Sequence, residues 1–349
     1  MMKKLIDKIR KRNVPPLSSR ITSETVSEHR EQILAGGRRF KYPIQYVRHK
    51  LVINTIIISS VALIVLLVVG WWQLYPAQNT SEFIYRITKV LPLPVASVDG
   101  QPVLYSDYLM KYLSSVHYLE QKEQVSPDTT DGKRQIEYIK QQSMQDAIAD
   151  AYAVKLSKDL DVSVSPVELS VFLKGQRQSS DGEISEQTYN AVILDYYGWS
   201  PAEYRHVTEN KLLRQKVSYA MDRTASETIS TISNSIKSNS GIDFRALAST
   251  ISSQTGVNVT YGVSNWVPKL NQDGGLAAGA SSLSKSQVSG VIKSTMGDGY
   301  YIVRLLDINT TQVNYEYVKV PLTAFTKSLD NIKNSGRVAE YISIKQNSK

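Results

Sequence analysis

The chain has no cysteine, although it is 349 residues long. This absence excludes a disulfide-stabilised scaffold, a thiolate metal site and a cysteine nucleophile. Without disulfides, the folded part must be stabilised by burial of apolar side chains, and hydrophobic residues make up 42% of the chain. A chain of this length is long enough to form two separate cores.

Charged residues are also missing from one long stretch, between Lys50 and Glu82. Its first part, residues 51–70 (LVINTIIISSVALIVLLVVG), is almost entirely aliphatic. About 20 apolar residues at a rise of 1.5 Å each match a hydrocarbon core of roughly 30 Å. We therefore predict one transmembrane helix over residues 51–74, with Trp71 and Trp72 at the far membrane interface. The segment is too long, and lies too deep in the chain, for a cleaved signal peptide.

Positive charge is concentrated before this segment. Residues 1–50 carry 13 Lys and Arg against 4 Asp and Glu, an excess equal to the net charge of +9 of the whole chain. Basic flanks stay in the cytoplasm, so we predict a basic cytoplasmic tail over residues 1–50. The protein would then cross the cytoplasmic membrane once, with its N-terminus inside and its C-terminal domains outside.

The tail is expected to contact anionic lipids of the inner leaflet, with docking of a cytoplasmic partner as the alternative. A short helix is predicted at about residues 25–34, ending at Gly36. Because the rest of the chain is electrically balanced, the basic pI of 9.3 does not point to nucleic-acid binding.

Helix-start signals dominate the residues after a predicted linker at 75–93. Ser165-Pro166-Val167-Glu168 and Ser200-Pro201-Ala202-Glu203 each combine an N-cap serine, a proline at the first helical position and a glutamate at the third. An Asp-Gly turn at residues 99–100 is expected between two short strands. Further helices are predicted at about 106–116, 133–160 and 186–196. Residues 94–216 therefore read as a mainly α-helical module.

The order of these segments resembles the N-terminal chaperone module of SurA-type and PrsA-type foldases. The resemblance is carried by VASVDGQPV at residues 95–103, LDVSVSPVEL at 160–169 and YGWSPAEYR at 197–205. It implies a helical module that holds unfolded exported polypeptides without a cofactor. An unrelated helical bundle with well-formed caps is the alternative.

Residues 217–308 mix strand and helix patterns, which favours a compact α+β domain. We predict a strand at 217–221, helices at about 225–238 and from 241, and strands near 257–263, 290–292 and 299–306. Glycines at 273–279 predict a loop. Residues 309–349 are expected to form a C-terminal strand–helix–strand extension that packs on this second domain.

Three segments of this region resemble parvulin-type, PpiC-like peptidyl-prolyl isomerases: DFRALA at 243–248, LSKSQVSGV at 283–291 and GYYIV at 299–303. Active members of that family carry one histidine on the first strand and one on the last. No histidine follows His206 in this chain, and Tyr301 stands where the second would be. The resemblance therefore implies a degenerate domain, for which we predict no catalytic residue and no metal.

Apolar side chains at helix and strand positions are the candidate walls of a substrate-binding pocket in this domain. They are Met221, Phe244, Leu247, Trp266, Leu283 and Tyr301. Ordinary core packing is the competing role for each of them.

The preferred interpretation is a membrane-anchored extracytoplasmic chaperone that binds unfolded exported polypeptides. The first alternative is a scaffold of the cell envelope that uses the same domains to join a complex. The second is an active prolyl isomerase with an altered pocket, because isomerisation makes and breaks no covalent bond.

Overall fold

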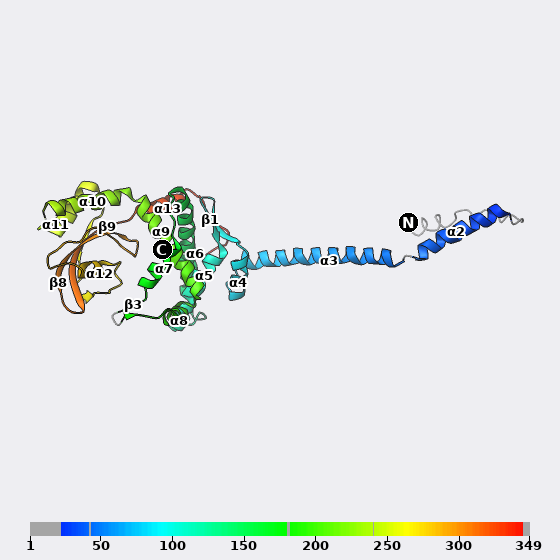
Figure 1. Ribbon diagram of the computed structural model, residues 1–349, viewed down its shortest axis with the longest axis horizontal. Coiled ribbons are helices and arrows are strands. Elements are labelled where there is room, and N and C mark those ends of the chain that lie inside the picture. The colour runs from blue at the N-terminus through cyan, green and yellow to red at the C-terminus, as the bar shows by residue number, and fades with distance from the viewer. Residues whose placement is uncertain (1–21, 42, 180–181, 240, 345–349) are drawn as a thin grey trace. The chain divides into compact units, whose positions relative to one another are not determined.

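The computed structural model describes residues 22–41, 43–179, 182–239 and 241–344 (Figure 1). Of the predicted basic tail, residues 1–21 lie outside this part. The chain divides into two compact units, Met1–Trp72 and Gln73–Lys349. Each unit is described by itself.

In its described residues the first unit consists of two helices, α2 (Ser23–Lys41) and most of α3 (Pro43–Leu74). Among the described residues, one helix is long and apolar enough to cross a membrane, His49–Leu74, with a mean hydropathy of 2.8. Its aliphatic side chains are exposed on every face. Helix α2 runs through Gly36 and Gly37, where we expected it to end. Glycine costs a helix about 1 kcal/mol but does not stop it without further end signals.

The second unit begins with a layer of helices, which we call the helical part. Its elements are α4 (Glu82–Val90), β1 (Pro94–Val98), β2 (Gln101–Leu104), α5 (Tyr105–Gln121), α6 (Thr130–Asp159), α7 (Pro166–Gly175), β3 (Gln178–Ser179), β4 (Gly182–Glu183), α8 (Glu186–Tyr197) and α9 (Pro201–Met221). The serines of both predicted caps accept hydrogen bonds as expected, Ser165 from the Glu168 N–H and Ser200 from the Glu203 N–H. The predicted strand pair around Asp99-Gly100 is confirmed as β1 and β2.

The core of the helical part is built from side chains of β1, α5 and α6. Val95, Tyr105, Tyr108 and Ile148 are almost completely buried in it. Two C-terminal elements complete this core, α13 (Ala324–Asn334) and β10 (Val338–Glu340). Strand β10 pairs antiparallel with β1, and the Phe325 ring lies 5.7 Å from that of Tyr152. The end of the predicted extension therefore packs on the helical part and not on the second domain.

The segment predicted as a linker, residues 75–93, is also part of this core. It contains α4, whose Ile84 is buried together with Leu74 at the end of α3. The Tyr105 hydroxyl donates to the Leu74 carbonyl at 2.8 Å, and the Tyr75 hydroxyl donates to the Pro94 carbonyl at 2.8 Å. The prolines and polar residues here end helix α3 and begin α4, and they do not separate α4 from the fold.

The rest of the second unit is the sheet part, α10 to β9. Its elements are α10 (Arg223–Ser238), α11 (Phe244–Thr255), β5 (Thr260–Val263), β6 (Val267–Pro268), α12 (Leu276–Ser281), β7 (Ile292–Lys293), β8 (Gly299–Ile308) and β9 (Gln312–Pro321). The strands follow the order β5-β9-β8-β7 and are antiparallel, with β6 also pairing with β9. Helices α10 and α11 cover one face, and α12 covers the other (Figure 1).

Two of our expectations at the boundaries of this part are corrected. The strand predicted at 217–221 is the last turn of α9, so the boundary at 216 cuts a helix. Val217 and Met221 alternate with Tyr219, but they are also four residues apart and face the helical core. The capping box at Ser200 starts this helix, and it ends only at Asp222.

The other boundary, at residue 308, falls between two strands of one sheet. Strands β8 and β9 pair from Gly299↔Pro321 to Ile308↔Val313, and β9 lies between β5 and β8. The predicted loop at 273–279 contains α12, because the Asp273 carboxylate accepts hydrogen bonds from the Leu276 and Ala277 N–H groups. The C-terminal extension is thus divided between both parts.

Candidate functional site

The six pocket residues expected from the sequence do not line one common pocket. Phe244 and Leu247 lie on α11 and are buried with side chains of α10 on one face of the sheet. Leu283 and Tyr301 belong to the cluster on the opposite face. The sheet separates the two pairs, because neighbouring residues of a strand point to opposite faces.

The remaining two residues lie elsewhere. Met221 packs against the core of the helical part, since it ends α9. Trp266 is 43% exposed in the loop between β5 and β6.

Tyr301, which the resemblance to parvulins places where their second histidine would be, is held in a polar cluster. Its hydroxyl donates to Asp298 at 2.6 Å, and Lys319 Nζ donates to the same carboxylate at 2.6 Å. Burial and the hydrogen bond to Asp298 raise the pKa of Tyr301 above its ordinary value of 10.0. The phenol stays protonated at neutral pH, so it cannot act as a base there.

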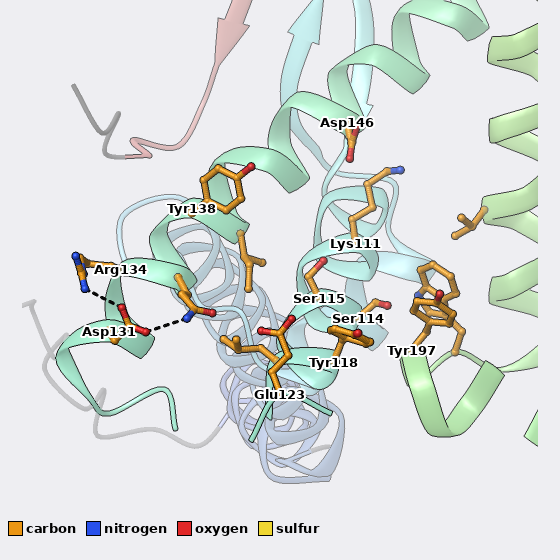
Figure 2. Close-up of a pocket in the computed structure, with 15 residues that line it drawn as sticks. Lys111, Ser114, Ser115, Tyr118, Glu123, Asp131, Arg134, Tyr138, Asp146 and Tyr197 are labelled. Atoms are coloured by element: carbon orange, nitrogen blue, oxygen red, sulfur yellow. Dashed lines mark hydrogen bonds and ion pairs between the residues drawn. The ribbon is translucent and has the colours of Figure 1, made fainter. Parts of the chain in front are cut away.

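An open surface of the second unit lies along α5, in the helical part. A cleft of about 790 Å³ runs between α5, α6 and the α8–α9 connection (Figure 2). Four aromatic side chains line it: Tyr118, Tyr138, Tyr197 and Trp199. In Figure 2 the labelled side chains of α5 lie between Arg134 and Tyr138 of α6 on one side and Tyr197 on the other. We call this the first cleft.

A second cleft of about 480 Å³ lies between α4, α5 and the same α8–α9 connection. It shares Ser114, Tyr197 and Trp199 with the first cleft, so these residues form a common wall. The rings of Tyr197 and Trp199 are stacked, with centroids 4.9 Å apart and an interplanar angle of 21°. Within the described residues, the buried indole N–H of Trp199 has no hydrogen-bond partner.

Local sequence explains how this wall is presented. Gly198 adopts φ 67° and ends α8, and the capping box of α9 begins two residues later. The left-handed conformation is easily adopted only by glycine. The short connection therefore holds Tyr197 and Trp199 beside α5, where the two clefts meet.

Most charges in the first cleft are neutralised by neighbours. Lys111 pairs with the buried Asp150 at 2.7 Å, and Arg134 pairs with Asp131 at 2.7 Å. Glu123 also lines the cleft, and in the described part of the chain no hydrogen bond or ion pair engages its carboxylate. The lining is therefore mainly aromatic and polar.

A hydrogen-bonded carboxylate joins the helices at the second cleft. Glu203 of α9 accepts from the Tyr85 hydroxyl at 2.6 Å and from Lys89 Nζ at 3.1 Å, both on α4. Burial alone would raise its pKa, but the hydrogen bonds from Tyr85, Ser200 and Lys89 outweigh burial and lower it to about 2. Glu203 is therefore ionised at neutral pH and fixes α4 against α9.

The aromatic lining of these clefts is suited to binding. Among the described residues, no group of three or more His, Asp or Glu side chains could hold a metal ion. Aromatic rings with polar tips offer large contact area and still tolerate water. Sequence reasoning placed the binding pocket in the sheet part and missed this surface. The signal that would have found it is the aromatic run Tyr196-Tyr197-Gly198-Trp199 between two helices.

The family model of the SurA-like N-terminal domain matches residues 44–218, which is half of the chain. The chain therefore belongs to this family, and the expected likeness to SurA-type foldases is confirmed for the helical module. The match includes the apolar helix, α4 and both clefts. The comparisons with curated proteins and with solved structures gave no match.

Proposed function

We propose that this protein is a membrane-anchored extracytoplasmic chaperone that binds unfolded exported polypeptides along α5. The observation that carries the proposal is the Tyr197–Trp199 wall shared by two open clefts, inside a domain of the SurA-like family. An unfolded chain exposes apolar side chains together with unpaired backbone groups. The clefts offer aromatic surface for the first and exposed polar side chains such as Ser115 for the second.

The shape of the clefts fits extended chain segments rather than one small ligand. They open on both sides of the same helix and meet at one aromatic wall, so a segment can pass from one cleft to the other. Such binding rests on shallow apolar contacts and is weak per residue, which suits clients that must be released to fold.

The anchor is assigned to α3, with residues 76–349 outside. The support is the length and apolar character of His49–Leu74, its inclusion in the family match, and the basic residues before it. A domain tethered in this way would meet exported chains close to the membrane.

For the sheet part we propose a parvulin-like domain without efficient isomerase activity. Both faces of its sheet are filled by side chains, and no histidine follows His206 in the sequence. Tyr301 is engaged by Asp298 at the position of the second family histidine.

The test uses the full chain in lipid nanodiscs and a reduced, alkylated client that cannot fold. Tyr197→Ala is compared with Tyr196→Ala, which removes an equally exposed tyrosine from the adjacent position outside both clefts. We expect Tyr197→Ala to raise several-fold the chaperone concentration that halves client aggregation, because it removes the shared wall. Tyr196→Ala should leave that concentration unchanged.

Equal behaviour of the two variants would contradict the assignment of the clefts. A wild-type chain that does not suppress aggregation, but crosslinks to one stoichiometric partner, would favour the envelope scaffold. A prolyl-isomerisation assay on the same sample should give only background turnover. Rates well above background would show that the sheet part is an enzyme with an altered pocket.

A further inference from the structure

Helix α4 carries an apolar face that no described residue of the second unit covers. Phe83 is 69% exposed, Val90 80% and Leu91 52%. The opposite side of the same nine-residue helix is packed, since Ile84 and Thr88 are buried. Residues 83 and 90 are two helical turns apart and share one stripe, on which Arg86 also lies.

This face lies close along the chain to the end of the apolar helix. Seven residues, 75–81, connect Leu74 to α4, and both Leu74 and Ile84 belong to one buried core. The Asn79 N–H donates to the Gln73 carbonyl at 2.9 Å, which folds the connection back on the helix end. Helix α4 is therefore fixed near the point where the span would leave the membrane.

We propose that the outward face of α4 (Phe83, Arg86, Val90 and Leu91) lies in the interfacial layer of the membrane that α3 spans. The proposal rests on the membrane span put forward under the proposed function. Amphipathic helices bind this way, with the apolar face between headgroups and acyl chains. Arg86 is suited to the boundary, because its stem can lie on apolar surface while the guanidinium reaches a lipid phosphate.

A lipid surface fits this face better than a protein partner does. The face consists of three apolar side chains on a short helix, which is far less than the area of a stable protein interface. Along the chain it also follows the aromatic pair Trp71 and Trp72 at the end of the proposed span, and amphipathic rings of this kind settle at headgroup level. The membrane is the one surface that is always present at that place.

The contact has a consequence for client binding. Tyr85, Arg86 and Lys89 of α4 also line the second cleft. Seating α4 in the interface would hold this cleft at the membrane surface, where an exported chain first becomes accessible. The lipid contact would therefore act on client capture as well as on anchoring.

The absence of cysteine allows a direct test with single labelled positions. The full chain is reconstituted into vesicles of zwitterionic and anionic phospholipid, with an environment-sensitive fluorophore at Phe83→Cys. Quenchers are attached to the lipids either near the headgroup or deep in the acyl chain. Ile58→Cys, in the apolar helix, reports the span, and Val192→Cys, exposed on α8, reports a position away from α4.

We expect the label at position 83 to be blue-shifted and to be quenched mainly by the shallow lipid quencher. The label at position 58 should respond to the deep quencher and the label at 192 to neither. If position 58 is quenched and position 83 behaves like position 192, the proposal for α4 is wrong while the span stands. Blue shift at position 83 without lipid quenching would mean that protein covers the face, which also overturns it.

Absence of deep quenching at position 58 would instead contradict the proposed span, and with it the interfacial contact.

A double variant, Phe83→Ser with Val90→Ser, gives an independent test. In the reconstituted wild-type chain, we expect α4 amides to be protected from hydrogen exchange relative to the same chain with these two serines. Unchanged protection would count against the lipid contact.

Discussion

The helical part and the sheet part of the second unit bury apolar side chains in different ways. Helices α5, α6 and α9 pack as cylinders, and open clefts remain along α5 where the aromatic wall is exposed. Strands β8 and β9 send alternate side chains to two faces, and each face is covered by its own helices. The first arrangement leaves binding surface, whereas in the second the expected residues Phe244, Leu247 and Tyr301 are buried. Apolar residues at regular spacing therefore identify a core more reliably than they identify a site.

The comparison predicts that the sheet part can be weakened without loss of client binding. Phe244 is buried beneath the Arg304 guanidinium, which lies 4.1 Å from the ring. Phe244→Ala should lower the free energy of unfolding by about 3–5 kcal/mol, because it removes contacts and leaves a cavity. Denaturant titration of the detergent-solubilised chain measures this loss. Phe83→Ala, at an exposed phenylalanine, should change stability by less than about 0.5 kcal/mol.

Client aggregation should be suppressed equally by Phe244→Ala and the wild type at temperatures where both are folded. A Phe244→Ala chain that stays folded but no longer suppresses aggregation would move the binding site to the sheet part. That result would contradict the difference between the two parts, in which the helical part binds clients and the sheet part does not.

A second prediction concerns the residue that connects the two parts. Asp222 is 4% exposed, and one carboxylate oxygen accepts from the Ala225 N–H at the start of α10. The other oxygen accepts from the Thr323 and Ala324 N–H groups at the start of α13. Asp222→Ala leaves these donors unpaired and should cost about 1–3 kcal/mol.

Because Asp222 contacts elements of both parts, its loss should also separate their unfolding into two transitions in calorimetry. Asp243→Ala is the matched control, since Asp243 caps α11 alone through the Ala246 N–H at 2.9 Å. The control should keep the cooperativity of the wild type. A single transition in Asp222→Ala would show that other contacts hold the parts together.

The smallest effect is a pH dependence of the helical part. The pKa of Glu203 is about 2 in the folded chain against an ordinary 4.5, so its stabilising effect is complete above pH 4.5. It is lost as the pH falls from 4.5 towards 2, with a slope below about 1.4 kcal/mol per pH unit because the group is partly solvent-screened. In the Glu203→Gln chain, the midpoint of unfolding should depend less on pH in this range.

His206 provides the opposite sign on the same helix. Its hydrogen bond to Asp107, at 2.9 Å, raises the pKa of the imidazole above 6.5. That contribution is complete below pH 6.5 and is lost as the pH rises through the folded pKa.

For the Glu203 prediction, a Glu203→Gln chain that keeps the wild-type acid dependence would show that the carboxylate does not fix α4 against α9.

Local sequence signals predicted the helical part well. The Ser-Pro-x-Glu starts of α7 and α9, the Asp-Gly turn and the uninterrupted apolar run each act within a few residues. The strand predicted at 217–221 was wrong because apolar residues that alternate also recur every four positions, which fits a helix. Only the helix start at Ser200 decides between the two structures. The candidate site was missed because its wall, Tyr197 and Trp199, lies in a short connection between two helices, where a local pattern does not tell a cleft wall from any other surface.

The sequence by itself determined the apolar helix, the helix starts and the family of the helical module, since each is written in contiguous residues. Tertiary structure alone decided that β9 lies between β5 and β8, that β10 pairs with β1, and that Tyr197 and Trp199 separate two clefts. Strand pairing and cleft walls join residues far apart in the chain. Which strands pair depends on how many apolar side chains are buried on both faces of the sheet, and a local sequence pattern does not contain this information.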